Sequence, residues 1–442
     1  MEKTYVLVNP FHDYALRFIA TISQRHGYQA LCVTTGPRTA ADLRAYPALR
    51  SLEFVHMPTE KLEGFARRLA SEREVLGAIP FAESVLQPVV SLLQGLGSTW
   101  NEPGVLAMLR DKFALKQRLR EMRPSLGIGP SRRVSVDSSG SFAPGGALPE
   151  RFVLKPNRGF GNRAVGFFSF RTPVAAIEEF IQSSGEREFV LEEYIPGIEY
   201  FVNGQVDHQG GCTTVAVFAY ERLWANGRQL DWLTWKVPRA SPEFRTFERY
   251  AQAVIAAVAL RRSPFHLEAK LDDGVPRLVE LGARLPGLGN ASLCNRLHGG
   301  KLDVFALAAD HYLHEGAREQ PQLDWDSYDA VELVYVHGIG FESGLIYSLE
   351  GIGCVESHPF FGSWVRKPYL GQRLSPTVDM FSMPWCFILE APAGRVDALR
   401  CAAEELRAKL RINSSPAPFK KATLATLDIL RRGRQRLERF LR

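Results

Sequence analysis

The sequence lacks the motifs that mark several common protein classes. It contains no GxGxxG and no GxxxxGK[ST], which removes the usual support for a dinucleotide-binding or P-loop protein. The six cysteines form no CxxC pair and no metal-ligand spacing, a pattern that favours reduced, mostly buried thiols and a cytoplasmic protein. No uncharged apolar run reaches the roughly 18 residues of a membrane-spanning helix, and the apolar run at residues 5–8 is too short for a signal-peptide core.

Basic surface of the kind that binds nucleic acid is also missing. The net charge is +6, but residues 420–442 alone carry eight basic and two acidic side chains, so the rest of the chain is neutral overall. A nucleic-acid-binding protein more often spreads its basic residues over a folded face. We therefore expect no nucleic-acid partner and interpret the tail as a solvated amphipathic helix, with docking to an acidic carrier protein as the alternative and to anionic lipid as a weaker one.

The 442 residues predict a soluble α/β (α+β) protein of two or three modules. Residues 5–8 read as a strand, 13–25 as a helix and 30–34 as a strand, which is typical of a βαβ unit with a parallel sheet. Apolar positions at helical spacing follow at residues 104–122. From about residue 151 the pattern becomes strand-rich.

The strongest chemical signal is a predicted hairpin at residues 265–281. Two alternating apolar runs flank Asp272-Asp273-Gly274, whose composition suits a tight turn. With the turn centred near Gly274, Glu268 and Glu280 lie opposite each other with Cβ atoms about 5 Å apart. Facing carboxylates repel, and Mg²⁺ would compensate because it takes carboxylate and phosphate oxygens as ligands. An exposed hairpin face with two solvated glutamates explains the pattern equally well.

Three further segments carry candidate groups. Lys155 stands at a strand end before a glycine loop at residues 157–163, which can approach phosphates closely or make a plain turn. The acidic segment at residues 190–200 can present backbone groups to a purine edge or serve as a linker. Arg284 can stabilise developing negative charge or form a surface ion pair.

The order of these segments resembles the ATP-grasp superfamily over roughly residues 100–310, and the α/β region before them resembles the domain that precedes that fold. The resemblance implies ATP with Mg²⁺, or Mn²⁺ in its place. It implies roles for residues at matching positions: phosphate contacts, the mobile loop, the adenine hinge, the ribose acid, the metal ligands and the catalytic groups. Lys112 and Lys155 would contact the phosphates, and Gly159 and Gly161 would belong to the mobile loop. Glu192, Glu193 and Ile195 would form the adenine hinge, and Glu199 would be the ribose acid. Glu268 and Glu280 would be the metal ligands, and Arg284 and, on a weaker match, Lys236 would be the catalytic groups.

The same resemblance implies a domain plan. We expect a Rossmann-like pre-ATP-grasp domain at residues 1–100, a small lobe with linking helices at 101–195 and a large lobe with the metal site at 196–320. A C-terminal α/β subdomain follows at residues 321–415, and a basic helical tail at 416–442. Many family members carry an asparagine where this chain has Gly282; bacterial L-amino-acid ligases resemble the chain in having a small residue there.

The implied function is ATP-dependent activation of a carboxylate as an acyl phosphate, followed by attack of an amine to give an amide or dipeptide. Its partners would be small-molecule carboxylate and amine substrates, and a homodimer is common in the superfamily. The alternative enzyme loads a carboxylate onto a carrier-protein thiol. A biotin-dependent carboxylase is disfavoured because the chain has no Ala-Met-Lys-Met site, and a nucleotide-binding module that has lost catalysis has Gly282 as its support.

Two weaker signals complete the prediction. Trp224, Trp232 and Trp235 fall in a stretch that we interpret as loop-like, where they would either line a substrate pocket or pack in a core. His266 shares the face of Glu268 and is expected to be a structural neighbour rather than a base.

Overall fold

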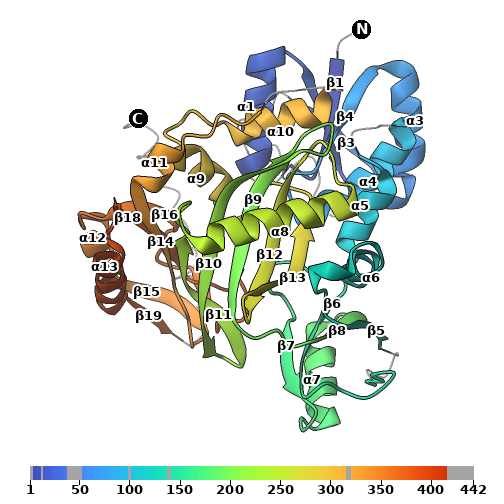
Figure 1. Cartoon of the computed structure of the whole chain (residues 1–442). Helices are drawn as coiled ribbons and strands as arrows, with labels where there is room; N and C mark the ends of the chain where they lie inside the picture. The colour runs from blue at the N-terminus through green and yellow to red at the C-terminus, as the bar shows by residue number, and fades with distance from the viewer. Residues whose placement is uncertain are drawn as a thin grey trace. The chain divides into compact units, whose positions relative to one another are not determined.

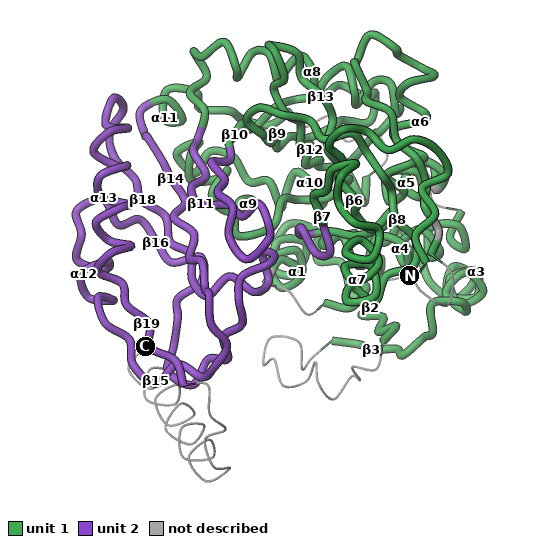
Figure 2. The backbone as a smooth tube through the Cα atoms, turned by 90° about the horizontal axis from the view of Figure 1, so that it is seen from below, with its two compact units in different colours: residues 1–160, 166–219, 237–329 green, residues 161–165, 220–236, 330–442 purple. Residues whose placement is uncertain are grey.

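The computed structural model describes residues 3–10, 13–36, 52–97, 101–136, 141–314 and 320–415. The predicted basic helix at residues 420–442 lies outside them. The chain forms two compact units (Figure 2): unit 1 comprises residues 1–160, 166–219 and 237–329, and unit 2 comprises residues 161–165, 220–236 and 330–442. Within the described residues, no helix has the length and apolar character needed to cross a membrane.

Unit 1 begins with the predicted parallel sheet, in the strand order β3-β2-β1-β4. The central strands are buried along almost their whole length, as expected where helices cover both faces of a parallel sheet. Its elements are β1 (Lys3–Val8), α1 (Asp13–His26), β2 (Gln29–Thr34), β3 (Glu53–His56), α3 (Leu62–Glu72), β4 (Glu74–Ile79) and α4 (Leu86–Leu96), with 3₁₀ turns η2 (Thr59–Lys61) and η3 (Glu83–Val85).

The predicted helical stretch at residues 104–122 is two helices rather than one. α5 (Pro103–Arg110) ends at Asp111, whose side chain then caps α6 (Lys112–Met122) by accepting a hydrogen bond from the backbone N–H of Ala114. A carboxylate at this N-cap position satisfies an orphan donor and starts a new helix. Lys112 is thereby placed in the first turn of α6.

The next part of unit 1 is an antiparallel sheet in the order β5-β8-β6-β7, covered by α7. Phe152, Leu154, Ile177 and Phe189 are among the residues of its core. The elements are η4 (Pro124–Leu126), β5 (Ser131–Ser135), β6 (Arg151–Pro156), β7 (Gly166–Ser169), α7 (Val174–Ser184) and β8 (Glu188–Glu193).

The last part of unit 1 is built on the strand order β13-β12-β9-β10, with α8 lying across one face (Figure 1). Tyr200 of β9 stacks on Phe247 of α8 with ring centroids 4.3 Å apart, so this face is apolar and helix-covered. The elements are β9 (Ile198–Val206), β10 (Cys212–Ala225), α8 (Pro242–Val258), β12 (Ser263–Asp272), β13 (Val275–Gly282), α9 (Asn290–Leu297), α10 (Val304–Leu313) and α11 (Trp325–Asp329).

Unit 2 has a sheet in the order β11-β14-β18-β16 and a smaller one in the order β17-β15-β19. Its elements are β11 (Arg228–Lys236), β14 (Val331–His337), β15 (Gly344–Glu350), α12 (Ile352–Glu356), β16 (Phe361–Arg366), β17 (Arg373–Leu374), β18 (Cys386–Pro392), α13 (Val396–Lys409) and β19 (Arg411–Ser415).

The interpretation of the tryptophan-rich stretch as a loop is wrong. Asn226 and Gly227 both have positive φ, the geometry of a tight hairpin turn, and they join β10 to β11. Trp232 and Trp235 pack against the core of unit 2, whereas Trp224 is 55% exposed. Of the two alternatives, core packing is therefore correct for Trp232 and Trp235.

Candidate active site

The hairpin of β12 and β13 places the two predicted metal ligands opposite each other, as expected. Glu268 pairs with Glu280 in the strand register. The tight turn lies at Asp273 and Gly274, both at positive φ. Counting back from this turn without a register shift, Glu268 would pair with the residue before Glu280. A β-bulge after Glu268 shifts the register and brings Glu280 into place, which is how bulges commonly re-aim side chains near active sites.

The predicted ribose acid lies on the same face of this sheet. Glu199 of β9 is paired with Lys270 of β12, two residues along the strand from Glu268, and paired residues point to one face. Glu199 is 5% exposed, whereas the side chains of Glu268 and Glu280 are 20% and 26% exposed. The face opposite α8 therefore carries three carboxylates, of which the two metal candidates are partly exposed.

His266 and Asn203 extend this face. His266 Nδ1 lies 2.7 Å from Asn203 Oδ1, and its Nε2 lies 3.4 Å from Glu268 Oε1. If Nδ1 donates its proton to the amide oxygen, a neutral ring points the lone pair of Nε2 at a carboxylate. A cation beside Glu268 would satisfy both groups. His266 is a structural neighbour of Glu268, as the sequence predicts, and Asn203 is an addition to the site.

Lys112 connects α6, the glycine loop and the hairpin. Its Nζ donates a 2.6 Å hydrogen bond to the carbonyl of Gly159 and lies 3.3 Å from Glu280 Oε1. The loop itself is anchored to α6, because the side chain of Asn157 accepts a hydrogen bond from the backbone N–H of Phe113. The structure thus brings together Lys112, Gly159 and Glu280 from three separate motifs.

A buried trio of two lysines and one glutamate lies beside these groups. Glu192 Oε2 accepts from Lys116 Nζ at 2.6 Å and from Lys155 Nζ at 3.0 Å. Burial alone would raise the pKa of Glu192, but the two ammonium groups hold it below its usual value. Burial lowers the pKa of Lys155, yet the carboxylates of Glu192 and Glu280 outweigh it and the pKa is raised. Burial dominates at Lys116 and lowers its pKa to about 8.

These contacts change how Glu192 is understood. Its Oε2 is taken by the two lysines, and its Oε1 is buried without a hydrogen-bond partner, so the side chain holds the lysines in place in addition to any contact with a purine. Lys116 was missed by sequence reasoning, although its spacing from Lys112 is four residues and such residues share one face of a helix. That spacing is the signal that would have found it.

The segment after β8 shapes a pocket in unit 1. The carbonyl of Ile195 accepts from Lys270 Nζ at 3.0 Å, and Glu193 is exposed. Gly197 has φ +87, and a Cβ there would lie 2.0 Å from the carbonyl oxygen of Leu271, so only glycine fits. The pocket is lined by Lys116, Gly129, Pro130, Glu192, Glu193, Tyr194, Ile195, Pro196, Asp272 and Arg277.

Arg284, just beyond β13, is held by a residue that sequence reasoning did not find. Glu83 is 5% exposed; its Oε2 accepts from Arg284 Nε and its Oε1 from Arg110 Nη1, both at 3.0 Å. Burial alone would raise the pKa of Glu83, but Arg284, Arg110 and Lys112 hold it below the usual value. A Cβ at Gly282 would lie 3.0 Å from Glu83 Oε2, so the small residue leaves room for this carboxylate.

Two candidate residues belong to unit 2. Gly161 has φ +67, and a Cβ there would lie 2.7 Å from Met380 Sδ. Lys236 stands at the end of β11 and is 4% exposed. The roles that the sequence suggests for these two residues stay predictions, as do the individual roles of the residues in unit 1.

The donor set of unit 1 suits a triphosphate with a hard divalent cation. Glu268 and Glu280 supply facing carboxylate oxygens, the ligand type that Mg²⁺ prefers. Lys112 offsets the charge of Glu280 in this structure, and an ammonium group of this kind also pairs with phosphate oxygens. The residues therefore fit the predicted metal, and the lysines fit the predicted nucleotide.

Comparison with known proteins agrees with this geometry. Residues 148–292 match the model of an ATP-grasp domain family. No sequence among curated proteins matches the chain. Among solved structures, an L-amino acid ligase from Bacillus licheniformis aligns with a TM-score of 0.70 at 15% identity, covering 94% of this chain and 99% of that one.

Two further solved structures share the fold. A phosphoribosylglycinamide synthetase from Anaerococcus prevotii aligns with a TM-score of 0.60 at 12% identity over 94% of this chain and 100% of its own. The biotin carboxylase domain of 2-oxoglutarate carboxylase from Hydrogenobacter thermophilus, solved as a dimer with MgADP, ADP and bicarbonate, aligns with a TM-score of 0.60 at 17% identity, covering 93% and 90% of the two chains. The expected fold is confirmed: this chain has the ATP-grasp fold and carries an ATP-grasp domain.

Proposed function

We propose that the protein is an Mg²⁺- and ATP-dependent carboxylate–amine ligase. It would activate an amino acid or another small acid as an acyl phosphate and couple it to an amine, with release of ADP and phosphate. The observation that carries the proposal is the meeting of Glu268 opposite Glu280, with Lys112 Nζ 3.3 Å from Glu280. The likeness to a solved L-amino acid ligase supports the choice of substrate class.

The residues divide into three roles. Glu268 and Glu280 would hold Mg²⁺, which supplies charge neutralisation for the phosphates when it is bound. Lys112 and Lys155 would bind and orient phosphate oxygens, and Glu199 and the backbone near Ile195 would hold the nucleoside. Since phosphoryl transfer needs little covalent help from the protein, most of the catalysis would come from this positioning and from electrostatic stabilisation.

Arg284 would stabilise negative charge in the second step. When an amine attacks an acyl phosphate, the carbonyl oxygen gains negative charge, and a fixed guanidinium near it lowers the barrier. Glu83 would orient Arg284, because it accepts the hydrogen bond from Nε while Nη1 donates to the carbonyl of Leu285, so the guanidinium is held from two sides. The glycine loop around Gly159 and Gly161 would limit the access of water to the intermediate.

The test is a substrate matrix with the full chain, Mg-ATP and pooled amino acids, followed by ADP release and product mass. A carboxylate labelled with ¹⁸O should transfer one labelled oxygen to phosphate, which identifies the acyl phosphate. Glu280→Gln should lower turnover strongly at a fixed, limiting Mg²⁺ concentration. Glu63→Gln should not, because Glu63 forms an exposed ion pair with Arg67.

The other outcomes are equally informative. Release of AMP and pyrophosphate would refute the acyl-phosphate mechanism. ADP release that needs an added carrier protein instead of an amine would select the thiol-loading alternative. Tight ADP binding with no turnover on any pool would favour a module that has lost catalysis.

A further inference from the structure

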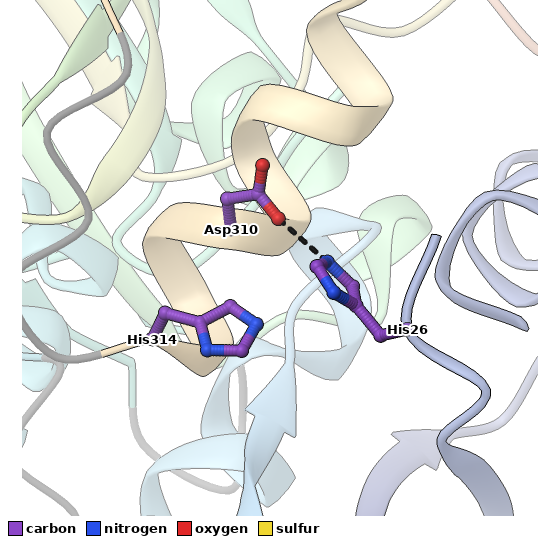
Figure 3. A group of neighbouring side chains, drawn as sticks. All are labelled: His26, Asp310 and His314. Atoms are coloured by element: carbon purple, nitrogen blue, oxygen red, sulfur yellow. Dashed lines mark hydrogen bonds and ion pairs between the residues drawn. The ribbon is translucent and has the colours of Figure 1, made fainter. Parts of the chain in front are cut away.

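A second cluster of chemically competent side chains lies where α1 and α10 end. His26 is the last residue of α1, Asp310 lies in the last turn of α10, and His314 is the residue that caps α10. One nitrogen of each histidine and one carboxylate oxygen all lie within 4.8 Å of one another. Figure 3 shows His26 approaching Asp310 from one helix while His314 comes from the end of the other.

We propose that His26, Asp310 and His314 bind a transition-metal ion of the Zn²⁺ class, separate from the Mg²⁺ of the proposed active site. Two imidazoles and one carboxylate are a frequent protein donor set for Zn²⁺, with water or another ligand in the remaining position. Imidazole nitrogen suits Zn²⁺, Ni²⁺ and Cu²⁺, whereas Mg²⁺ and Ca²⁺ prefer an all-oxygen shell. This donor set therefore selects against the ion that the ligase would use.

The cluster has an unsatisfied donor or acceptor. Nε2 of His314 is buried and has no hydrogen-bond partner, which is costly for a polar atom unless something binds it. A tetrahedral ion with Zn–N bonds of about 2.0–2.1 Å holds its ligand atoms roughly 3.3 Å apart. The ion would replace the proton between His26 Nε2 and Asp310 Oδ1, which now lie 2.8 Å apart. Rotation of the His314 ring can bring its Nε2 closer without breaking a hydrogen bond of that atom.

The surroundings of Asp310 resemble the outer shell of a metal site. Asp310 is 5% exposed; its Oδ1 lies 2.8 Å from His26 Nε2, and its Oδ2 accepts a 2.8 Å hydrogen bond from Arg25 Nη2. Ligating carboxylates are commonly hydrogen-bonded in this way through their other oxygen, which fixes their orientation. The ring of His26 stacks on Tyr28 with centroids 5.0 Å apart, so two of the three ligands are already oriented.

The carboxyl ends of α1 and α10 add an electrostatic field that favours a cation. Asp310 and His314 are four residues apart, so both lie on the same side of the end of α10. His26 stands at the same kind of end, the carboxyl terminus of α1. Each helix carries partial negative charge at its carboxyl end, and the two ends converge on one point. This field partly offsets the positive charge of Arg25 and makes the position suitable for a cation.

The expected consequence is structural. A bound ion would add a link between α1 and α10, two helices that already pack on each other although His26 and Asp310 are 284 positions apart in the chain. A ligand that binds only the folded state stabilises it in proportion to its saturation. For a chain of this size, a 100-fold excess of metal over the dissociation constant should raise the unfolding midpoint by roughly 3 °C.

The test is a titration of the full chain, stripped with chelator, with Zn²⁺ by calorimetry and with Co²⁺ by visible absorption. We expect one equivalent to bind, with the intense Co²⁺ bands of a tetrahedral site. His314→Ala should weaken binding by at least about 10-fold. It should lower the unfolding midpoint of the metal-free protein only slightly, because Nε2 has no hydrogen bond to lose although the ring contacts with His26 and Tyr28 are removed. His358→Ala, a histidine of unit 2, is the matched control and should bind as the wild type does.

Glu268→Gln separates this site from the proposed active site, where His266 and Glu268 also offer ligands. Retained binding in Glu268→Gln with loss in His314→Ala supports the proposal. Retained binding in His314→Ala, loss in Glu268→Gln alone, or no uptake of Zn²⁺ at micromolar concentration overturns it. None of these readouts depends on ligase activity, so the result stands whether or not the proposed function is correct.

Discussion

Replacing Glu83 with glutamine tests the part of the candidate site that only the structure revealed. The change keeps the volume of the side chain, so it creates no cavity, but it removes a buried negative charge. Arg110 and Arg284 then lose their shared counter-ion while their side chains remain only 11% and 18% exposed. Removing one partner of a buried ion pair commonly costs about 3–5 kcal/mol. Because both arginines retain some access to water, we expect the lower end, about 3 kcal/mol.

The matched control is Glu63→Gln. Glu63 pairs with Arg67 at 2.8 Å, but the two side chains are 48% and 65% exposed, and exposed pairs contribute roughly 0–1 kcal/mol. Urea denaturation of both variants compares the same chemical change at a buried and an exposed position. Since the chain has two units, midpoints should be followed with probes in each rather than with one global fit.

The same variant has a kinetic prediction. If Glu83 orients Arg284, then Glu83→Gln should lower kcat of the ligase by about 100-fold, the size of effect expected from a misplacement near 1 Å. The KM for ATP should change much less, because the lysines that would contact phosphate stay in place. An unfolding midpoint equal to that of Glu63→Gln, together with an unchanged kcat, would refute the assignment of Glu83 as a positioning residue.

Three further measurements test neighbouring features. Glu280→Gln should raise the Mg²⁺ concentration for half-maximal activity, measured at fixed ATP, by about 10-fold or more. An unchanged Mg²⁺ requirement would exclude Glu280 as a metal ligand. Glu192→Gln should lower the denaturation midpoint more than Lys116→Met, because the first leaves two buried lysines without their carboxylate and the second leaves one buried pair intact; the reverse order would contradict that account. The stability that Glu83 contributes should be fully present above pH 4.5 and lost as the pH falls below it, since its folded pKa is lowered from that value. The free energies of unfolding of Glu83→Gln and wild type should therefore converge as the solution is acidified. A difference that persists at low pH would argue against the ion pair.

The sequence predicted the structural features that depend on residues close together in the chain. Alternation of apolar residues around Asp273 and Gly274 predicted the hairpin and the pairing of Glu268 with Glu280, although that pairing depends on a bulge that no pattern announced. The Asn226-Gly227 dipeptide is an equally good turn signal. The tryptophans clustered around it favour a loop-like interpretation, although the stretch is a hairpin.

Interactions between distant segments were beyond the sequence. Glu83 and Arg284 are 201 positions apart, and a single glutamate in a 3₁₀ turn has no spacing that would mark it. The buried trio around Glu192 is a similar case, because an acid at a strand end looks solvated until the lysines that surround it are known. The break between α5 and α6 was readable in principle, since Asp111 is a good N-cap residue, but the apolar spacing continues through it.

Gly282 and Glu83 are best understood as one feature. On the sequence alone, a glycine where many ATP-grasp proteins carry asparagine suggested a lost metal ligand and gave the degenerate-module hypothesis its support. In the structure, a Cβ at this position would lie 3.0 Å from Glu83 Oε2, a tight contact at the oxygen that accepts from Arg284 Nε. Glycine here therefore keeps a buried carboxylate in contact with the arginine that we assign to the second chemical step. The same residue that suggested loss of catalysis supports a site that retains it.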